Sequence, residues 1–338
     1  MLFRSRKFTN IMVKTNKPEN GLLYQTALSN SGPKEISSLI KGLNGRYIEP
    51  NVGNDPIRNP ASIPTGSNFF SFDPRTVPMV YADSQGIKLA NTFIETFKLE
   101  NNRYPDKVAM EVWGSETVRH QGMQEAQALA YLGVAVKRDK LGKIEGVELI
   151  PREKLKRPRV DVLFSTTGLY RDNFPMLVEL FDKGVQLAYA STEPDNPIRI
   201  NSEKIYKKLV ATGMDTPTAR KRSLIRVFAE APGTYGNSVA DASVASGSWD
   251  NDSSIANLYI KKASYGYGNG IWGESMEKEF RDALSGSDAV IHSRTTSLYM
   301  SLDNDDFFGY AGALAQGIKQ VDTGSRSEER RVGKECRS

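Results

Sequence analysis

Charged side chains follow each of three segments that the sequence predicts to be strands of a parallel sheet. The three predicted strands cover residues 108–113, 159–165 and 185–190. The charged residues that follow them are Glu116 with Arg119, Arg171 with Asp172, and Glu193 with Asp195. Because ligands bind at the carboxyl ends of parallel strands, we expect these side chains to line one polar edge of the sheet. His120 follows the first of these loops and is the histidine that we expect to join them.

Carboxylates also cluster near the end of the chain, where Asp303, Asp305 and Asp306 directly precede two phenylalanines. Such a cluster suits a hard divalent cation, and it also suits the positive N-terminal end of a following helix. The spacing does not match an EF-hand, because Gly309 and the required glutamate are misplaced. Helix capping is the favoured role on spacing alone, and metal binding is the alternative.

A segment rich in glycine and aromatic residues, 265–273 (YGYGNGIWG), is predicted to be a loop. Its last six residues have the GxGxxG spacing, but no predicted strand leads into them, so a dinucleotide site is not expected. Tyr265 and Tyr267 are able to stack on a flat ring. The alternative is a surface turn with packed aromatic side chains.

Several classes of protein are excluded by missing motifs. The sequence contains no GxxxxGK[ST] motif, no GxSxG elbow and no HExxH pair, and its two histidines, His120 and His292, are far apart. ATP hydrolysis by a Walker mechanism and a His-based metal site are therefore not expected within this chain. No apolar run approaches the roughly 18 residues of a membrane span, and no secretory signal opens the chain. We therefore expect a cytoplasmic protein.

The last residues, 326–338 (RSEERRVGKECRS), resemble translated sequencing-adapter read-through, and the alternative is a solvated charged tail. Without them the 45 basic and 40 acidic residues fall to 40 and 37, so charge gives little support for nucleic-acid binding. The only cysteine, Cys336, lies in this tail, so neither a disulfide framework nor a thiolate nucleophile is expected.

The order of predicted elements indicates an α/β fold with a parallel-sheet core of the Rossmann or flavodoxin-like kind and a helix-rich C-terminal part. Helices are predicted at 35–43, 80–99 and from residue 121 to 132, and a further strand of the sheet at 134–136. The expected divisions are an incomplete, poorly ordered leader (1–34), a proline-rich ordered loop with helices packing on the core (35–103), the sheet domain (104–200), a mainly helical part (201–325) and the tail (326–338).

A collinear set of motifs resembles the large subunit of cobaltochelatase, with the magnesium chelatase H subunit as its nearest relative. The motifs span about residues 42–321, nearly all of the chain before the tail. They are Tyr47–Pro50 (YIEP), Gly53–Pro60 (GNDPIRNP), Pro64–Phe69 (PTGSNF), Phe72–Pro74 (FDP), Trp113–Arg119 (WGSETVR) with Gly122, Arg157–Val162 (RPRVDV), Gly168–Asp172 (GLYRD), Phe174-Pro175, Ala231–Gly236 (APGTYG) and Leu302–Phe308 (LDNDDFF).

The resemblance implies a subunit that binds a tetrapyrrole and inserts a divalent metal, cobalt rather than magnesium, while AAA+ motor subunits hydrolyse ATP. Metal insertion requires desolvation of the ion and removal of two pyrrole protons, which calls for oxygen or imidazole ligands and a nearby base. The substrate-binding candidates are Glu116, Arg119, His120, Arg171, Asp172, Glu193, Tyr235, Tyr265 and Tyr267, and the metal candidates are Asp303, Asp305 and Asp306.

Two departures from the family pattern qualify this expectation. An upstream His-Gly…Glu…Pro-Gly-Lys stretch is missing, so the chain is expected to be a fragment that is inactive alone. The segment 293–299 (SRTTSLY) stands where the aerobic branch is expected to carry Glu-His-Asp, which resembles the anaerobic and archaeal branch instead. The alternatives are therefore a magnesium-porphyrin chelatase subunit, a haem-binding or dechelating relative without a motor, and a plain sugar- or nucleotide-binding α/β protein.

Overall fold

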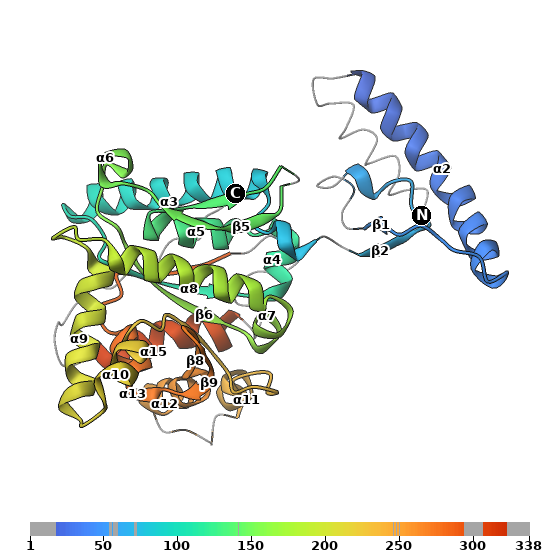
Figure 1. Ribbon diagram of the computed structural model, residues 1–338. Helices are drawn as coiled ribbons and strands as arrows, with labels where there is room; N and C mark the ends of the chain where they lie inside the picture. The colour runs from blue at the N-terminus through green and yellow to red at the C-terminus, as the bar shows by residue number, and fades with distance from the viewer. Residues whose placement is uncertain are drawn as a thin grey trace. The chain divides into compact units, whose positions relative to one another are not determined.

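The computed structural model describes residues 18–53, 56, 60–70, 73–140, 142–245, 247, 249, 251–293 and 307–322. The chain divides into two compact units, Met1–Pro74 and Arg75–Ser338. Figure 1 shows both units and labels helices and strands where there is room.

The first unit contains one long helix, α2 (Pro18–Leu43), and a short parallel strand pair, β1 (Asn51–Val52) with β2 (Asn68–Phe70). Residues 18–34 of the expected disordered leader are therefore helical, and the helix does not start at residue 35; residues 1–17 lie outside the described residues. Pro33 lies inside α2 and obscures its continuity in the sequence, because proline removes a backbone donor and often ends a helix.

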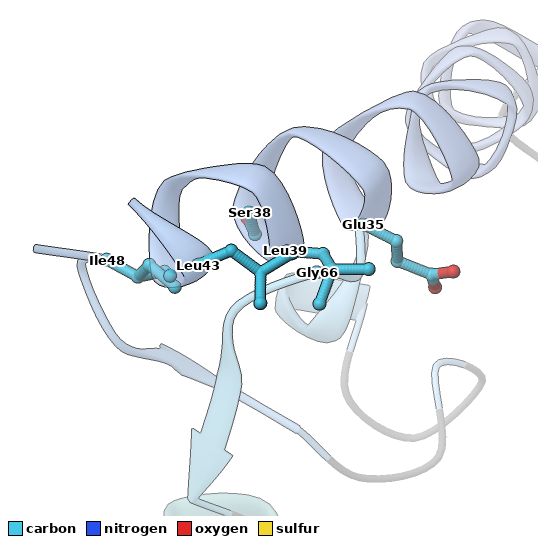
Figure 2. A pocket seen from close by; sticks show the side chains of 7 residues that line it. Glu35, Ser38, Leu39, Leu43, Ile48 and Gly66 are labelled. Carbon is cyan, nitrogen blue, oxygen red and sulfur yellow. The ribbon is translucent and has the colours of Figure 1, made fainter. Parts of the chain in front are cut away.

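The proline-rich segment after α2 packs back against this helix within the first unit. The backbone N–H of Thr65 donates to Oγ of Ser31 at 3.0 Å. A groove of about 320 Å³ runs between the helix and this segment, and it is lined by Leu39, Leu43 and Ile48 with Glu35 and Gly66 (Figure 2). The described part of this segment is an irregular chain that carries short elements of secondary structure.

The second unit is built around a six-stranded sheet in the order β10-β3-β6-β7-β8-β9. The first four strands are mutually parallel, and β8 and β9 form an antiparallel hairpin at one side. Their bounds are β3 Lys107–Val112, β6 Asp161–Thr166, β7 Val227–Ala229, β8 Tyr265–Gly268, β9 Ile271–Ser275 and β10 Ala289–His292. The sheet takes strands from both sides of residue 200. The expected division there between a sheet domain and a mainly helical part stays a prediction.

Helices cover both faces of this sheet (Figure 1). One face carries α3 (Val80–Asn101), α5 (Met123–Leu132) and α8 (Pro175–Ala190), with Phe181 stacked on Phe164 of β6. The other face carries α12 (Asp252–Ala263), α13 (Glu277–Leu284) and α15 (Ala313–Asp322), whose buried side chains share one core with Ala109 and Leu163. Because successive strand residues alternate between faces, Glu111 and Ser165 lie on the α12 side.

Shorter helices connect these layers and continue the chain around the sheet. They are η1 Pro60–Ser62, η2 Pro74–Thr76, α4 Gly114–His120, α6 Arg152–Leu155, α7 Gly168–Asn173, α9 Pro197–Ala211, α10 Thr216–Ser223, α11 Val239–Val244 and the π-helical turn η3 Phe308–Gly312. Several begin with the expected caps, for example Asp215, whose carboxylate accepts the N–H of Thr218 at 3.0 Å.

Four local predictions are wrong. Residues 185–190 continue helix α8 instead of forming a strand, because their apolar run completes a buried helical face. The strand at 134–136 is β4 (Val134–Arg138), which pairs only with β5 (Ile144–Leu149) in a separate antiparallel sheet. Residues 265–273 are the β8–β9 hairpin, with glycines at its turn. Residues 115–117, which the sequence predicts to be a polar turn after the strand 108–113, belong to helix α4.

The fold class is confirmed: the second unit is an α/β structure with a mostly parallel sheet and many helices. Among the described residues, no helix combines the length and the apolar character that crossing a bilayer requires.

Candidate functional site

The carboxyl ends of β10, β3, β6 and β7 meet at one edge of the sheet, because these strands run parallel in register. His292 is the register partner of Glu111, and Glu111 is the register partner of Ser165, so the last residues of three neighbouring strands lie side by side. The helices α4 and α7 begin directly at this edge, after β3 and β6. This carboxyl edge is where a parallel α/β sheet presents residues to a ligand.

Helix α4 presents the first group of predicted residues. Arg119 Nη1 donates to Glu116 Oε1 at 2.8 Å, and the arginine side chain stays 45% exposed while the glutamate is buried. His120 is buried, and its Nδ1 accepts the backbone N–H groups of Gly122 and Met123 at 3.2 and 3.0 Å. Arg119 is therefore the exposed cation of this loop, whereas His120 fixes the turn from α4 into α5.

Gly122 is required in that turn. It has φ +90°, and a Cβ at this position would lie 2.6 Å from Cα of Pro78. The close approach lets Met79 donate its N–H to the carbonyl of Gln121 at 2.9 Å, so the start of α3 is tied to the end of α4. The glycine thus fixes α4, and with it Glu116, against the carboxyl edge.

Helix α7 presents the second group. Thr167 caps it, and Arg171 makes a two-pronged ion pair with Asp172, with Nε–Oδ1 at 2.7 Å and Nη2–Oδ2 at 2.8 Å. Nη1 of the same guanidinium donates to the carbonyls of Glu230 and Ala231 at 3.0 and 2.9 Å. The Arg171 hydrogen bonds lower the pKa of Asp172, so this carboxylate is ionised at neutral pH.

Two of the three predicted tyrosines join this group. The hydroxyl of Tyr235 donates to Oδ2 of Asp172 at 2.7 Å, and its ring, 63% exposed, lies beside the Arg171 guanidinium. The hydroxyl of Tyr267 donates to the carbonyl of Glu230 at 2.6 Å. Tyr265 is half-buried and lies opposite Ala229, at the end of β7. The structure thus gathers an exposed aromatic ring and a fixed cation at one place.

Glu193 does not lie at this edge, contrary to the expectation. Its carboxylate pairs with Arg159, which precedes β6 and therefore lies at the amino end of the sheet. Asp195 pairs with Arg152 at 2.8 Å. Because residues 185–190 are helical, the chain has returned to the amino side before it reaches Glu193, and this residue is removed from the site.

Two buried carboxyl groups at the carboxyl edge were missed. Glu111, 0% exposed, is near the end of β3, and Glu230, 2% exposed, follows the end of β7. Trp113 Nε1 donates to Glu111 Oε1 at 3.2 Å, and the Tyr310 hydroxyl donates to Glu230 Oε1 at 3.0 Å. Each glutamate interrupts an otherwise apolar run, which was the signal available in the sequence.

Aromatic rings surround these carboxyl groups. The ring of Trp113 lies edge-on to His292 and to Tyr310, with centroid distances of 4.5 and 6.2 Å. The His292 ring in turn lies edge-on to Phe307, with a centroid distance of 5.3 Å. Burial raises the pKa of Glu111 well above its usual range and also raises that of Glu230. The edge therefore combines an apolar, aromatic environment with two buried carboxyl groups whose pKa values are raised by burial.

The metal candidates Asp303, Asp305 and Asp306 lie outside the described residues, so their role stays a prediction. Within the part of the chain that the structure describes, no group of three or more His, Cys, Asp or Glu side chains is arranged to hold a metal ion.

A parallel α/β sheet with this edge is typical of a ligand-binding unit in which the strand ends supply the chemistry. The comparisons name the family: the family described as CobN/Magnesium Chelatase matches residues 9–329, and the chain belongs to it. The motifs that suggested the cobaltochelatase and magnesium chelatase resemblance are thereby confirmed.

Individual relatives agree with this assignment. The chain is 32% identical over 298 residues to the aerobic cobaltochelatase subunit CobN of a Sinorhizobium species, covering 87% of this chain and 23% of that protein. It is 32% identical over 307 residues to the H subunit of the magnesium chelatase of Chlorobaculum parvum, covering 90% and 23%. The catalytic subunit of cobaltochelatase from Mycobacterium tuberculosis superposes with a TM-score of 0.75 and 28% identity, covering 89% and 26%. The chain thus spans about a quarter of the length of these relatives.

Proposed function

We propose that this chain is a portion of the tetrapyrrole- and metal-binding large subunit of an ATP-dependent metal chelatase, and that the metal is cobalt and the macrocycle a corrin precursor. The observation that carries the proposal is the carboxyl edge of the sheet in a chain that belongs to this family. An exposed aromatic ring, two arginines and two buried carboxyl groups lie there: Tyr235, Arg119, Arg171, Glu111 and Glu230. The cytoplasm is the proposed location.

The exposed groups match the two chemical features of a tetrapyrrole. Its flat conjugated ring stacks on aromatic side chains, and Tyr235 offers such a face, held in orientation by its bond to Asp172. Its peripheral carboxylates pair with guanidinium groups, and Arg119 is the exposed one at this edge. Arg171 is buried and fully engaged, so its part is to fix Asp172 and the end of β7.

The metal and its energy source are assigned by chemistry and by the family resemblance. Oxygen ligands from Asp303, Asp305 and Asp306 suit a divalent ion on its way to the macrocycle. The 338 residues carry no Walker motif, which fits a division of labour in which AAA+ partner subunits hydrolyse the ATP. Upstream parts of the subunit supply the remaining groups, so this chain is proposed to be inactive alone.

A magnesium-porphyrin subunit is the second candidate, because the identities to the cobalt and magnesium relatives are equal at 32%. A haem-binding or dechelating relative is the third form of the same site. Binding experiments separate these: the full chain is titrated with a cobalt-free corrinoid, a free-base porphyrin and haem, and the fluorescence of Trp113, Trp249 and Trp272 is followed.

The proposal expects quenching by the corrinoid, and Tyr235→Ala weakens this binding by roughly ten-fold, the worth of a stacked ring. Tyr104→Ala, which changes a half-buried tyrosine before β3 at the opposite edge, is the control and leaves the affinity unchanged. Quenching only by porphyrin or by haem selects the second or third candidate. Lack of quenching by all three ligands contradicts the whole proposal.

A further inference from the structure

Glu111 and Glu230 are one connected feature of the carboxyl edge, although they come from strands on either side of β6. Trp113 donates to the first and Tyr310 to the second, and these two aromatic rings contact each other at 6.2 Å. Oε2 of each glutamate is fully buried and has no hydrogen-bond partner among the described residues. Each of these two strand ends thus carries one buried carboxyl oxygen without a hydrogen-bond partner in the described part of the chain.

The groups that face this pair are mostly neutral. From β6 and α12 come Ser165 and Tyr259, whose hydroxyls are 2.8 Å apart, and from β10 comes His292, the register partner of Glu111. Tyr267 and Arg171 face the end of β7 at Glu230. The Arg171 guanidinium is committed to Asp172 and two backbone carbonyls, and in the described part of the chain neither Glu111 nor Glu230 has an ion-pair partner.

Such an arrangement cannot keep two negative charges. Neighbouring carboxylates in an apolar site repel each other, so at least one of them retains a proton and the two titrate as a coupled pair. The pKa of Glu111 is raised first by burial and further by the charge of Glu230, in agreement with that geometry. Structural stability does not account for it, because a buried carboxyl with an unsatisfied oxygen destabilises a fold.

We propose that Glu111 and Glu230 are a proton-exchanging pair for the pyrrole nitrogens of the macrocycle. This inference rests on the proposed function. When a divalent metal replaces two N–H protons, the ionised member of the pair forms one O–H bond as the first N–H bond breaks and releases that proton to water. It then accepts the second proton in the same way, and the two nitrogen anions neutralise the metal charge. In the reverse direction the pair delivers two protons one after the other, each replaced from water, and the metal leaves. Trp113 and Tyr310 are positioning residues, because each holds Oε1 of one glutamate by a hydrogen bond.

The test is infrared difference spectroscopy of the full chain, following the carbonyl stretch of protonated carboxyl groups against pH. The wild-type chain is expected to show a band that persists at neutral pH. Glu111→Gln removes part of this band, and Glu230→Gln shifts the titration of what remains, because the charged neighbour is lost. Glu153→Gln, an exposed carboxylate on α6, is the matched control and leaves the band unchanged. If both variants leave it unchanged, or each group titrates independently of the other, the pair does not exist.

Free-base porphyrin and the cobalt-free corrinoid are then added to the same samples, with tryptophan quenching measured in parallel. Binding is expected to perturb the carboxyl band in the wild type and not in Glu111→Gln or Glu230→Gln. Quenching without a band change overturns the pair and leaves the proposed function standing, whereas absence of quenching overturns both. Trp113→Phe and Tyr310→Phe keep the carboxyls intact and guard against misfolding of the glutamine variants. Each removes one donor and is expected to raise the pKa of the glutamate that it contacts, and unchanged titration in both would also overturn the proposal.

Discussion

Arg159 and Glu193 form a two-pronged ion pair on the amino side of the sheet, with Nε–Oε2 and Nη2–Oε1 both at 2.9 Å. The guanidinium is 0% exposed and also donates to the carbonyls of Leu132, Gly133 and Ile150. It therefore joins the end of α5, the start of β4 and the end of β5 to the start of β6. This pair stabilises the scaffold and does not contact the carboxyl edge.

Replacing Glu193 by glutamine is expected to lower the free energy of unfolding by about 1–3 kcal/mol, because one buried charge loses its ionised partner. Tetrapyrrole affinity is expected to stay unchanged. Urea unfolding and tryptophan quenching measure the two quantities. Asp195→Asn is the control, since its pair with Arg152 is 34% and 48% exposed and should contribute less than about 1 kcal/mol. A loss of affinity with intact stability would return Glu193 to the site.

Gly122→Ala is expected to destabilise the chain by more than about 2 kcal/mol, because left-handed strain adds to a clash with Pro78. Gly142→Ala is the matched control: its φ is also positive, at +81°, but nothing lies within 4 Å of the added Cβ. Strain alone, about 1 kcal/mol, should remain there. Thermal unfolding compares the two variants, and equal losses would show that the approach of Pro78 is not tight.

Glu125 on α5 gives the fold a pH dependence. Burial raises its pKa to about 7 from 4.5, and Thr117 Oγ1 donates to Oε1 at 2.5 Å. Because its pKa is higher in the folded chain than in the unfolded one, protonated Glu125 makes its full contribution to the free energy of unfolding below pH 4.5. This contribution is lost as the pH rises through about 7.

Glu125→Gln removes that dependence. The variant should therefore gain up to about 3 kcal/mol relative to the wild type between pH 4.5 and 7. Denaturant unfolding at several pH values checks this, with Glu153→Gln as the exposed control for loss of a carboxylate. If the difference in unfolding free energy between Glu125→Gln and the wild type does not change with pH, the pKa of Glu125 is not raised in the folded chain.

Lys107 shows the opposite dependence, at the amino end of β3. Burial lowers its pKa to about 8 from 10.5, although Nζ donates to the carbonyls of Ala283 and Ser285 at 2.9 and 2.7 Å. Between these pH values the unfolded chain binds more protons than the folded one, so stability rises with pH.

Lys107→Met should lack this rise. Wild type should gain up to about 3 kcal/mol over the variant between pH 8 and 10.5. Lys154→Met, at an exposed position on α6, is the control, and unfolding curves in urea provide the measurement. If the free energies of unfolding of Lys107→Met and the wild type change with pH in the same way, the pKa of Lys107 is not lowered.

The sequence by itself determined the local elements with strong periodicity and the family. Helix α5 ends at Gly133 as predicted, because a left-handed glycine closes it, and β6 was found from its β-branched apolar run. Arg119, Arg171 and Asp172 were predicted because their positions follow strand ends, and Tyr235 was predicted from the APGTYG motif of the family; the carboxyl edge collects all four. The family motifs are short contiguous segments, so they can be identified in the sequence without knowledge of the fold.

Only the tertiary structure decided which apolar runs are strands and which residues meet across the sheet. Residues 185–190 (VQLAYA) read equally well as a buried strand or as the end of a buried helix, because a short, mostly apolar run is typical of both. That one difference moves Glu193 to the opposite edge. Glu111 and Glu230 are 119 positions apart, and no local pattern relates them. Their pairing arises because strand order places β3, β6 and β7 side by side, so burial and repulsion between the two carboxyls are properties of the packed sheet alone.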